Sequence, residues 1–247
     1  MTGSSRGMGR SIALELARVG ASVVLHARRP SEDIATTEKL VAEAGDRVAS
    51  VFGDLADLGS IEPMVDAAWA CFGRADIWIN NAGADVLTGE TAAWSFEEKL
   101  DLLWRVDVLG TVRLSRLVGE RMKGSQTRGV ILNVGWDQAE QGMAGDSGEM
   151  FSTTKGAIMS FTRSLAQSLA PLVRVNCVAP GWIRTAWGEQ ASEYWQQRAQ
   201  SEALLERWGT PADVARVMCF LSSPAADFIT GQIINVNGGF RYGGTQS

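Results

Sequence analysis

Short runs of β-branched and apolar residues alternate with longer helical patterns along almost the whole chain. Strands are predicted at residues 22–27, 48–52, 77–79, 130–134, 174–178 and 233–236. Helices are predicted at residues 31–44, 60–72, 95–122, 151–170 and 210–221. Strands that are joined by crossover helices pair in parallel and carry helices on both faces of the sheet. The sequence therefore predicts an α/β fold with a doubly wound parallel sheet. Because no linker or repeat interrupts the pattern, we expect one domain over residues 1–247.

A glycine-rich stretch opens the chain and runs straight into an apolar-periodic segment. Residues 2–9 read Thr-Gly-Ser-Ser-Arg-Gly-Met-Gly. Glycine has no Cβ, so such a stretch can turn tightly and let a phosphate come close. The helix behind it offers free N–H groups and a positive dipole end to an anion. The pattern indicates a phosphate-binding loop, although a glycine-rich turn near a terminus would read the same way.

The segment that should precede such a loop is missing from the sequence. A dinucleotide-binding loop follows a β-strand, whereas only Met1 precedes Thr2. In a doubly wound fold that strand lies in the middle of the sheet. Three explanations stay open: a misassigned start codon, a truncated chain, or a sheet that is damaged at its centre. We favour the first two together.

Composition excludes several classes of function. The formal net charge is -5 and the basic residues form no block, which argues against nucleic acid or an anionic membrane as a partner. No apolar run reaches the roughly 18 residues of a membrane span. Cys71, Cys177 and Cys219 lie far apart, and no secretion signal precedes them, so we expect a reducing, cytoplasmic setting. His26 is the only histidine, so we expect neither a metal site nor a histidine-based triad.

The segments that follow the predicted strands should form a single site. Ligands of an open parallel sheet bind beyond the carboxyl ends of its strands. The segments that this rule brings to one edge are 3–9, residue 54, 81–83, 135–149 and 180–188.

Several motifs, taken in order, resemble the short-chain dehydrogenase/reductase family over essentially the whole chain. They are Thr2-Gly3 with Gly7 and Gly9, Asp54-Leu55, Asn80-Asn81-Ala82-Gly83, Ser152 with Lys155-Gly156-Ala157, Arg174-Val175-Asn176 with Ala179-Pro180-Gly181, and Thr230-Gly231-Gln232 through Gly238-Gly239. The resemblance implies a Rossmann-like sheet and an NAD or NADP cofactor. It implies hydride transfer to or from a carbonyl or alcohol of a small-molecule substrate. It also implies a homodimer or homotetramer through the helices at 95–122 and 151–170.

The same resemblance gives the cofactor-binding residues. They are Gly3, Ser5, Arg6, Gly7, Met8, Gly9, Arg28, Asp54, Leu55, Asn81, Ala82, Gly83, Lys155, Pro180, Gly181, Ile183 and Thr185. An acid at the end of the second strand of such a fold would bind the ribose diol, but here Arg28 and Arg29 stand there. Guanidinium groups suit a 2′-phosphate, so we predict NADP over NAD. The alternative is that these arginines are solvated surface charge.

The catalytic positions depart from the family pattern. The family uses Asn, Ser, Tyr and Lys; here only Lys155 matches, with Phe151 where the tyrosine would be and Asp107 where the asparagine would be. The strand that would carry the serine ends in Gly135-Trp136. A carboxylate in a partly dry pocket has a raised pKa and can serve as acid or base. We therefore predict Asp137 as the replacement, acting with Lys155 and Asp107. The alternatives are an acidic surface loop, and a Lys155 that only holds the cofactor ribose.

The substrate side is expected to be aromatic. The residues predicted there are Trp136, Gln138, Phe151, Trp182 and Trp187, with residues 182–207 as a lid. The sequence thus favours an NADP-linked oxidoreductase with a non-standard acid–base group. A catalytically silent nucleotide-binding relative, and a lyase or isomerase that does not consume the nucleotide, stay open.

Overall fold

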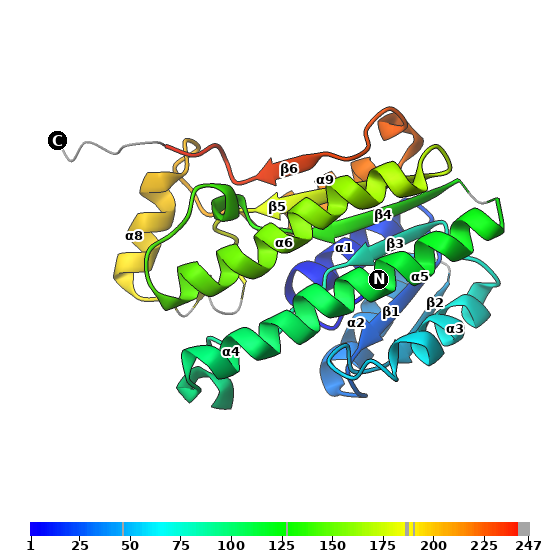
Figure 1. The fold of residues 1–247 in the computed structure, drawn as a ribbon, viewed down its shortest axis with the longest axis horizontal. Helices are drawn as coiled ribbons and strands as arrows, with labels where there is room; N and C mark the ends of the chain where they lie inside the picture. The colour runs from blue at the N-terminus through cyan, green and yellow to red at the C-terminus, as the bar shows by residue number, and fades with distance from the viewer. Residues whose placement is uncertain (46, 127, 186–187, 190, 242–247) are drawn as a thin grey trace.

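Two parallel sheets form the centre of the molecule (Figure 1). The computed structural model describes residues 1–45, 47–126, 128–185, 188–189 and 191–241. One sheet pairs β1 with β2, and the other has the order β3-β4-β5-β6. The strands are β1 (Val23–Ala27), β2 (Val48–Phe52), β3 (Ile77–Asn80), β4 (Gly129–Val134), β5 (Val173–Pro180) and β6 (Ile233–Val236). The predicted α/β fold with parallel strands is confirmed.

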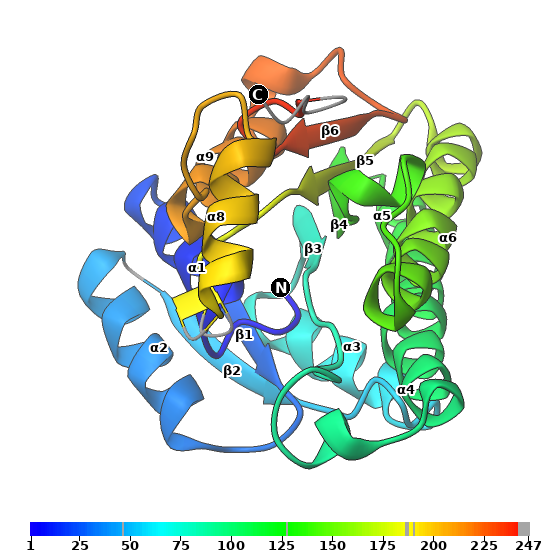
Figure 2. The same cartoon turned by 90° about the vertical axis from the view of Figure 1, so that its left-hand side faces the viewer.

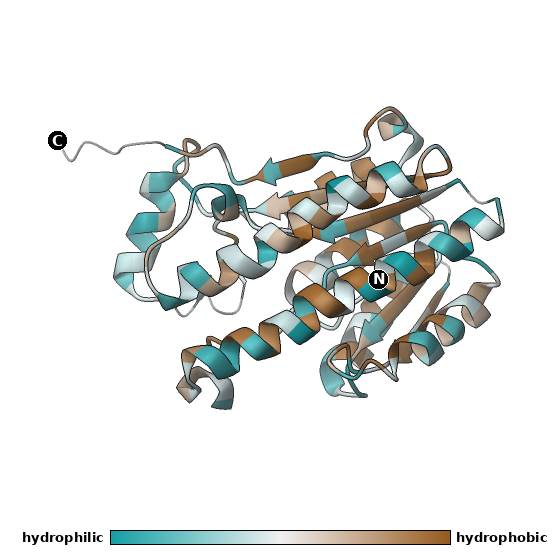
Figure 3. Cartoon of the chain, viewed as in Figure 1, coloured by the Kyte–Doolittle hydropathy of each residue, from teal (hydrophilic) through white to brown (hydrophobic). Residues whose placement is uncertain are grey.

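Helices cover both faces of the sheets (Figure 2). They are α1 (Gly7–Arg18), α2 (Glu32–Ala44), α3 (Ile61–Phe72), α4 (Phe96–Leu103), α5 (Thr111–Gly124), α6 (Asp146–Leu169), α8 (Glu193–Glu202) and α9 (Pro211–Ser222). One apolar core lies beneath α1 and α9, and a second lies beneath α3, α5 and α6. Each strand of the sheet centre is apolar on both faces because each face meets one of these cores (Figure 3).

Two helices differ from the prediction. The helix expected at 95–122 is interrupted by a π-helical stretch, η2 (Trp104–Gly110), which contains Asp107. The helix expected at 151–170 begins at Asp146, because Gly145 takes a positive φ of 92° immediately before it. The loop predicted at 135–149 is therefore shorter, and it holds the 3-10 turn η3 (Asp137–Glu140). By contrast, α9 begins as predicted, and Thr210 and Asp213 form a capping box at its start.

The gap expected in the middle of the sheet lies between β1 and β3, which do not pair with each other. The first two residues of the chain bridge this gap by bonding to both strands. The Met1 nitrogen donates to Val24 O (2.7 Å), and the Thr2 N–H donates to Ile79 O (2.9 Å). These contacts hold the glycine-rich loop at the carboxyl edge of both sheets.

Candidate active site

Two of the predicted loops of the site, 3–9 and 81–83, pack against each other at this edge. Gly3 has a φ of 62°, and a Cβ on it would lie 2.6 Å from the Cα of Ala82. A Cβ on Gly9 would lie 2.0 Å from the carbonyl oxygen of Gly3. The side-chain amide of Asn81 donates to that same oxygen over 2.8 Å. Side chains at positions 3 and 9 would therefore force apart the loops that follow Met1 and β3.

The start of α1 is open to a ligand. Its N-cap residue Arg6 is extended and provides no side-chain cap. The preceding carbonyl of Ser5 accepts from Arg10 of α1 (2.8 Å) and from Thr37 of α2 (2.7 Å), which fixes the loop between the two helices. The N–H groups at Gly7 and Met8 begin the helix, and such groups bind anions. This geometry fits a phosphate group.

The remaining predicted cofactor residues lie along the same edge. Arg28 is exposed directly after β1, and Asp54 and Leu55 follow β2. Asn81, Ala82 and Gly83 follow β3, and the buried Oδ1 atom of Asn81 has no hydrogen-bond partner. Pro180 ends β5, and Gly181, Ile183 and Thr185 follow it. An orphaned buried acceptor beside an uncapped helix start is a site with unfilled hydrogen-bonding capacity.

Lys155 and Asp107 form a buried ion pair. The Lys155 Nζ lies 2.8 Å from Asp107 Oδ2, and the two side chains are only 14% and 2% exposed. Asp107 Oδ1 accepts from the backbone N–H of Ala84 over 2.8 Å. The π-helical stretch positions Asp107 opposite α6, and Gly83 makes room for its carboxylate. The structure therefore brings together two of the three predicted catalytic residues.

Asp137 lies apart from this pair, in contact with the segments that follow β5 and β6. Its Oδ2 atom accepts from the side-chain amide of Asn237 over 3.0 Å, and its Oδ1 atom has no partner. The residue is 5% exposed, and burial raises the pKa of its carboxyl to about 6. The neighbouring Gln138 is also buried, and its Nε2 atom lacks an acceptor. Among the residues described, no ion pair joins Asp137 to Lys155.

Aromatic side chains line two parts of this region. Trp136 and Phe151 pack edge to face with ring centroids 6.2 Å apart. Trp182 packs against Trp195 (5.5 Å) and Trp208 (6.1 Å), and its Nε1 atom donates to Glu202. The predicted substrate residue Trp187 lies outside the described residues.

Two further residues contribute to the site without having been predicted in it. His26 is buried in β1, where its Nδ1 atom accepts from the Gly3 N–H (3.3 Å) and its Nε2 atom faces Gly53 O (3.0 Å). Burial lowers its pKa to about 4, so the ring stays neutral and supports the glycine-rich loop. Asn237 directly follows β6. Its place at the carboxyl end of a strand was the one sequence signal that could have assigned it to the site.

The described residues contain neither a cluster of metal ligands nor a membrane-spanning helix. Within them, no group of three His, Cys, Asp or Glu side chains could hold a metal ion. Their helices include none with the length and apolar character needed to cross a membrane.

Comparison with known proteins identifies the family. Residues 3–241 match the family model described as Enoyl-(Acyl carrier protein) reductase. The chain is 35% identical to 3-oxoacyl-(acyl-carrier-protein) reductase FabG of Aquifex aeolicus, covering 97% of this chain and 95% of that protein.

Two solved structures are similar in fold and sequence. A short-chain dehydrogenase/reductase variant of Serratia marcescens is 29% identical with a TM-score of 0.87, and the match covers 97% of this chain and 95% of that one. L-Sorbose reductase of Gluconobacter frateurii, solved with NADPH and L-sorbose, is 31% identical with a TM-score of 0.87, covering 98% and 95%. The chain belongs to the short-chain dehydrogenase/reductase family, whose members bind a nicotinamide cofactor and act as oxidoreductases.

Proposed function

We propose that this protein is an NADP-dependent oxidoreductase that transfers hydride to or from a carbonyl or alcohol group of a small molecule. One observation supports the proposal: the loop after β3 contacts both the glycine-rich loop that leads into the open start of α1 and the Lys155–Asp107 pair. The glycine-rich loop and the open helix start suit the phosphates of a dinucleotide. The ion pair provides a fixed ammonium group for the nicotinamide end.

The cofactor is held by the loops after β1, β2, β3 and β5. The N–H groups at Gly7 to Gly9 bind the pyrophosphate, and Asn81 offers its free Oδ1 atom to a donor on the cofactor. The exposed guanidinium groups of Arg6 and Arg28 are available for a 2′-phosphate, which favours NADP over NAD. Lys155 binds the nicotinamide ribose. When bound, the nicotinamide supplies or accepts the hydride.

Asp137 supplies the proton in this proposal. Reduction of a carbonyl adds a hydride to carbon and a proton to oxygen, and the Asp137 carboxyl donates that proton and becomes a carboxylate. Its pKa of about 6 leaves both forms populated near neutral pH. When Asp137 is protonated, its unpaired Oδ1 atom and the unpaired Nε2 atom of Gln138 can both donate to the substrate oxygen.

The remaining parts of the proposal concern substrate and assembly. Trp136, Phe151 and Trp182 provide apolar walls that suit a ring or a sugar face. In this proposal residues 1–247 form one domain, and residues 182–207 form a lid over its substrate site. The helices from residue 95 to 122 and from 151 to 170 form the contacts of a homodimer or homotetramer. The free cysteines fit a cytoplasmic protein.

Cofactor choice is tested by titrating NADPH and NADH against the chain and against Arg28→Ala. Loss of one charged hydrogen bond should weaken NADPH binding by about 10- to 100-fold and leave NADH binding unchanged. Arg18→Ala is the matched control, because it removes an arginine at the last residue of α1, at the end of that helix opposite the glycine-rich loop. Equal loss for both nucleotides would refute the role of Arg28.

Catalysis is tested by following NADPH oxidation with a panel of ketones, aldehydes and sugars. Asp137→Asn should lower kcat by about 10²- to 10⁴-fold and remove a limb of the pH–rate profile near pH 6, with NADPH affinity retained. An unchanged rate for Asp137→Asn would remove Asp137 from the proposal.

A second candidate is a nicotinamide-binding protein without catalysis. The phenyl ring of Phe151 favours it, because this residue lies one turn before Lys155 and carries no proton to donate. Tight NADPH binding without turnover of any carbonyl or alcohol in the panel would select this candidate.

A further inference from the structure

The side-chain amide of Asn237 can face Asp137 in one orientation only. Its Oδ1 atom accepts from the backbone N–H of Gly239 over 3.0 Å, so this end of the amide is the oxygen. Its Nδ2 atom therefore points at Asp137, and it donates to Oδ2 of that carboxyl group over 3.0 Å. An amide NH₂ group has no capacity to accept. The Oδ2 atom of Asp137 is therefore the acceptor in this bond.

This bond decides which oxygen of Asp137 carries the acidic proton. The carbonyl oxygen of a protonated carboxyl group accepts more strongly than its hydroxyl oxygen, so the bond from Asn237 favours Oδ2 as the carbonyl oxygen. The proton then belongs on Oδ1. That atom is buried and has no hydrogen-bond partner among the described residues, so it can donate to a bound molecule.

Backbone segments enclose the Asn237–Asp137 bond. A Cβ on Gly181 would lie 2.5 Å from the Cβ of Asn237 and 2.9 Å from Oδ2 of Asp137, so the segment after β5 closes one side of the bond. The Gly181 N–H donates to Val236 O over 3.1 Å, which joins that segment to the end of β6. The bonded pair is thus held between two backbone segments that are themselves paired.

The segment that carries Asn237 is also bound to the end of α8. The Arg241 N–H donates to the backbone oxygen of Glu202 over 2.8 Å. The Glu202 carboxylate repels negative charge on Asp137 and so helps to raise its pKa, after the larger effect of burial. Arg198 balances that carboxylate, because its Nε atom lies 2.6 Å from Oε1 of Glu202. The lid helix therefore contributes to the surroundings of Asp137 mainly through the position of Asn237.

We propose that Asn237 is a positioning residue that directs the acidic proton of Asp137 to Oδ1, from which it passes to the substrate oxygen. The inference rests on the proposed function, in which Asp137 is the proton donor. When Oδ1 releases the proton, Asp137 becomes a carboxylate and its Oδ2 atom keeps the bond from Asn237. Asn237 acts through Asp137 and takes no proton itself.

The first experiment titrates the Asp137 carboxyl group by ¹³C NMR in protein without cofactor, with Asp137→Asn to assign the signal. Burial raises the pKa of this group to about 6, whereas the donor on Asn237 lowers the pKa. Asn237→Ala removes the donor and should raise the titration midpoint by about one pH unit. Asn237→Asp keeps the shape and the acceptor for Gly239 but introduces a second carboxylate, so the midpoint should rise further. Asn235→Ala is the matched control, because it removes an exposed asparagine of β6, and it should leave the midpoint unchanged.

Turnover then separates the place of the proton from its affinity. At about pH 5 the Asp137 carboxyl is largely protonated in the parent and in Asn237→Ala, because the pKa lies near 6 or above. A difference in kcat at this pH therefore reports the orientation of the acid. We expect kcat for carbonyl reduction to fall about tenfold in Asn237→Ala, with the KM for NADPH unchanged. Asn235→Ala should keep the parent rate.

Three results would overturn the proposal. They are an unchanged titration midpoint in Asn237→Asp and Asn237→Ala, an equal shift in the Asn235→Ala control, and an unchanged kcat for Asn237→Ala at pH 5. Failure of the proposed function gives a different result, since the parent itself would then reduce no carbonyl. In that case the titration, which needs no turnover, still decides whether Asn237 holds the Asp137 carboxyl.

Discussion

The buried Lys155–Asp107 pair offers a quantitative test of how the site is held together. Asp107→Asn keeps the shape of the side chain, but it removes the charge and replaces one of the two oxygens, which face Ala84 and Lys155 separately, with an NH₂ group. We expect this change to lower the free energy of unfolding by about 3 kcal/mol. Lys155→Met leaves a carboxylate that is 2% exposed without its counter-ion, and should cost about 4 kcal/mol.

The double variant separates pairwise coupling from the cost of each change. Once both charges are gone, neither is left buried and unpaired, so the double variant should lose about 4 kcal/mol rather than the sum. The coupling energy is then about 3 kcal/mol. Urea denaturation of the parent, the two single variants and the double variant measures it.

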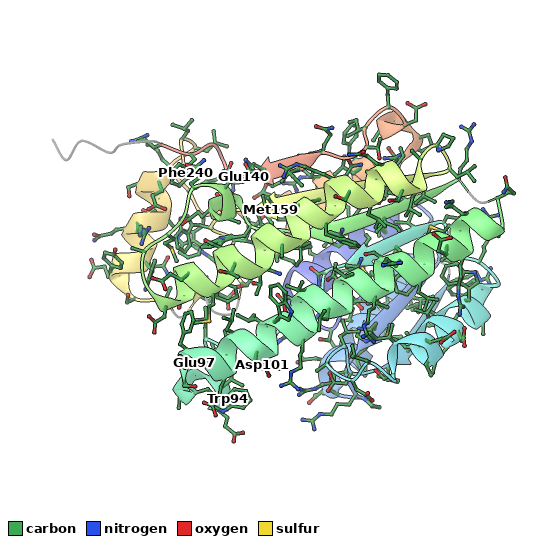
Figure 4. All side chains as sticks on the ribbon, in the orientation of Figure 1. Trp94, Glu97, Asp101, Glu140, Met159 and Phe240 are labelled. Atoms are coloured by element: carbon green, nitrogen blue, oxygen red, sulfur yellow. The ribbon has the colours of Figure 1, made fainter. Side chains whose placement is uncertain are left out.

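An exposed pair in the same chain provides the control. Arg163 and Glu140, the latter labelled in Figure 4, lie 2.9 Å apart with both side chains 51% exposed. The distance almost equals that of the buried pair, so burial is the main difference. The control pair should couple by less than about 1 kcal/mol and weaken in salt. Coupling of Lys155 with Asp107 that is no larger than the control would refute the reasoning.

Three further predictions rest on single sites. The free energy of unfolding should fall by about 2 kcal/mol from pH 8 to pH 6, because burial lowers the pKa of the Met1 amine from 8.0 to about 5, and the unfolded chain therefore takes up the proton first. His26, lowered from 6.5 to about 4, should extend the loss below pH 6, and urea titrations across this range would show no slope if both groups were solvated. The pKa of Asp137 is raised to about 6, so its ionised form lowers the free energy of unfolding above that pH. Asp137→Asn should therefore stabilise the protein by about 3 kcal/mol at pH 8 and by little at pH 4, measured by urea denaturation. Gly135→Ala should destabilise the protein by about 1–3 kcal/mol, because its Cβ would lie 2.8 Å from Cγ of Met159. Gly156→Ala is the control: its Cβ would have no atom within 4 Å, so thermal melts should show no loss or a gain in stability.

The strands were predictable because each is a short β-branched run bounded by turn residues. β2 and β6 match their predicted limits, and β4 differs by one residue. The start of α6 was not predictable to the same degree. Glycine at position 145 is compatible with many conformations, and only the positive φ that it adopts fixes the helix start five residues earlier.

The candidate site was predictable as an edge of the sheet but not as a set of contacts. The carboxyl-end rule places Asp137 and Asn237 at one edge, yet they are 100 residues apart in sequence, and nothing in the spacing pairs them. Asp107 reaches Lys155 because it lies in a π-helical stretch. The sequence of that stretch contains no residue that would predict a π-helical rather than an α-helical turn. Local pattern decides which segments reach the edge, whereas the directions of individual side chains depend on packing across the whole fold.

On the prediction that Phe151 and Asp107 stand where the family has tyrosine and asparagine, these two departures would be linked physically. In the family pattern the lysine ammonium lies beside a phenol and lowers its pKa. Here the neighbour one turn away is the apolar ring of Phe151, packed against Trp136, so the ammonium needs another partner, and Asp107 provides the charge. Phe151→Tyr alone would therefore place a phenol beside an ammonium whose charge is already balanced. We expect the phenol to be more acidic, and any gain in NADPH oxidation larger, in Phe151→Tyr combined with Asp107→Asn than in Phe151→Tyr alone. Equal gains would mean that Asp107 does not reduce the influence of Lys155 on that position.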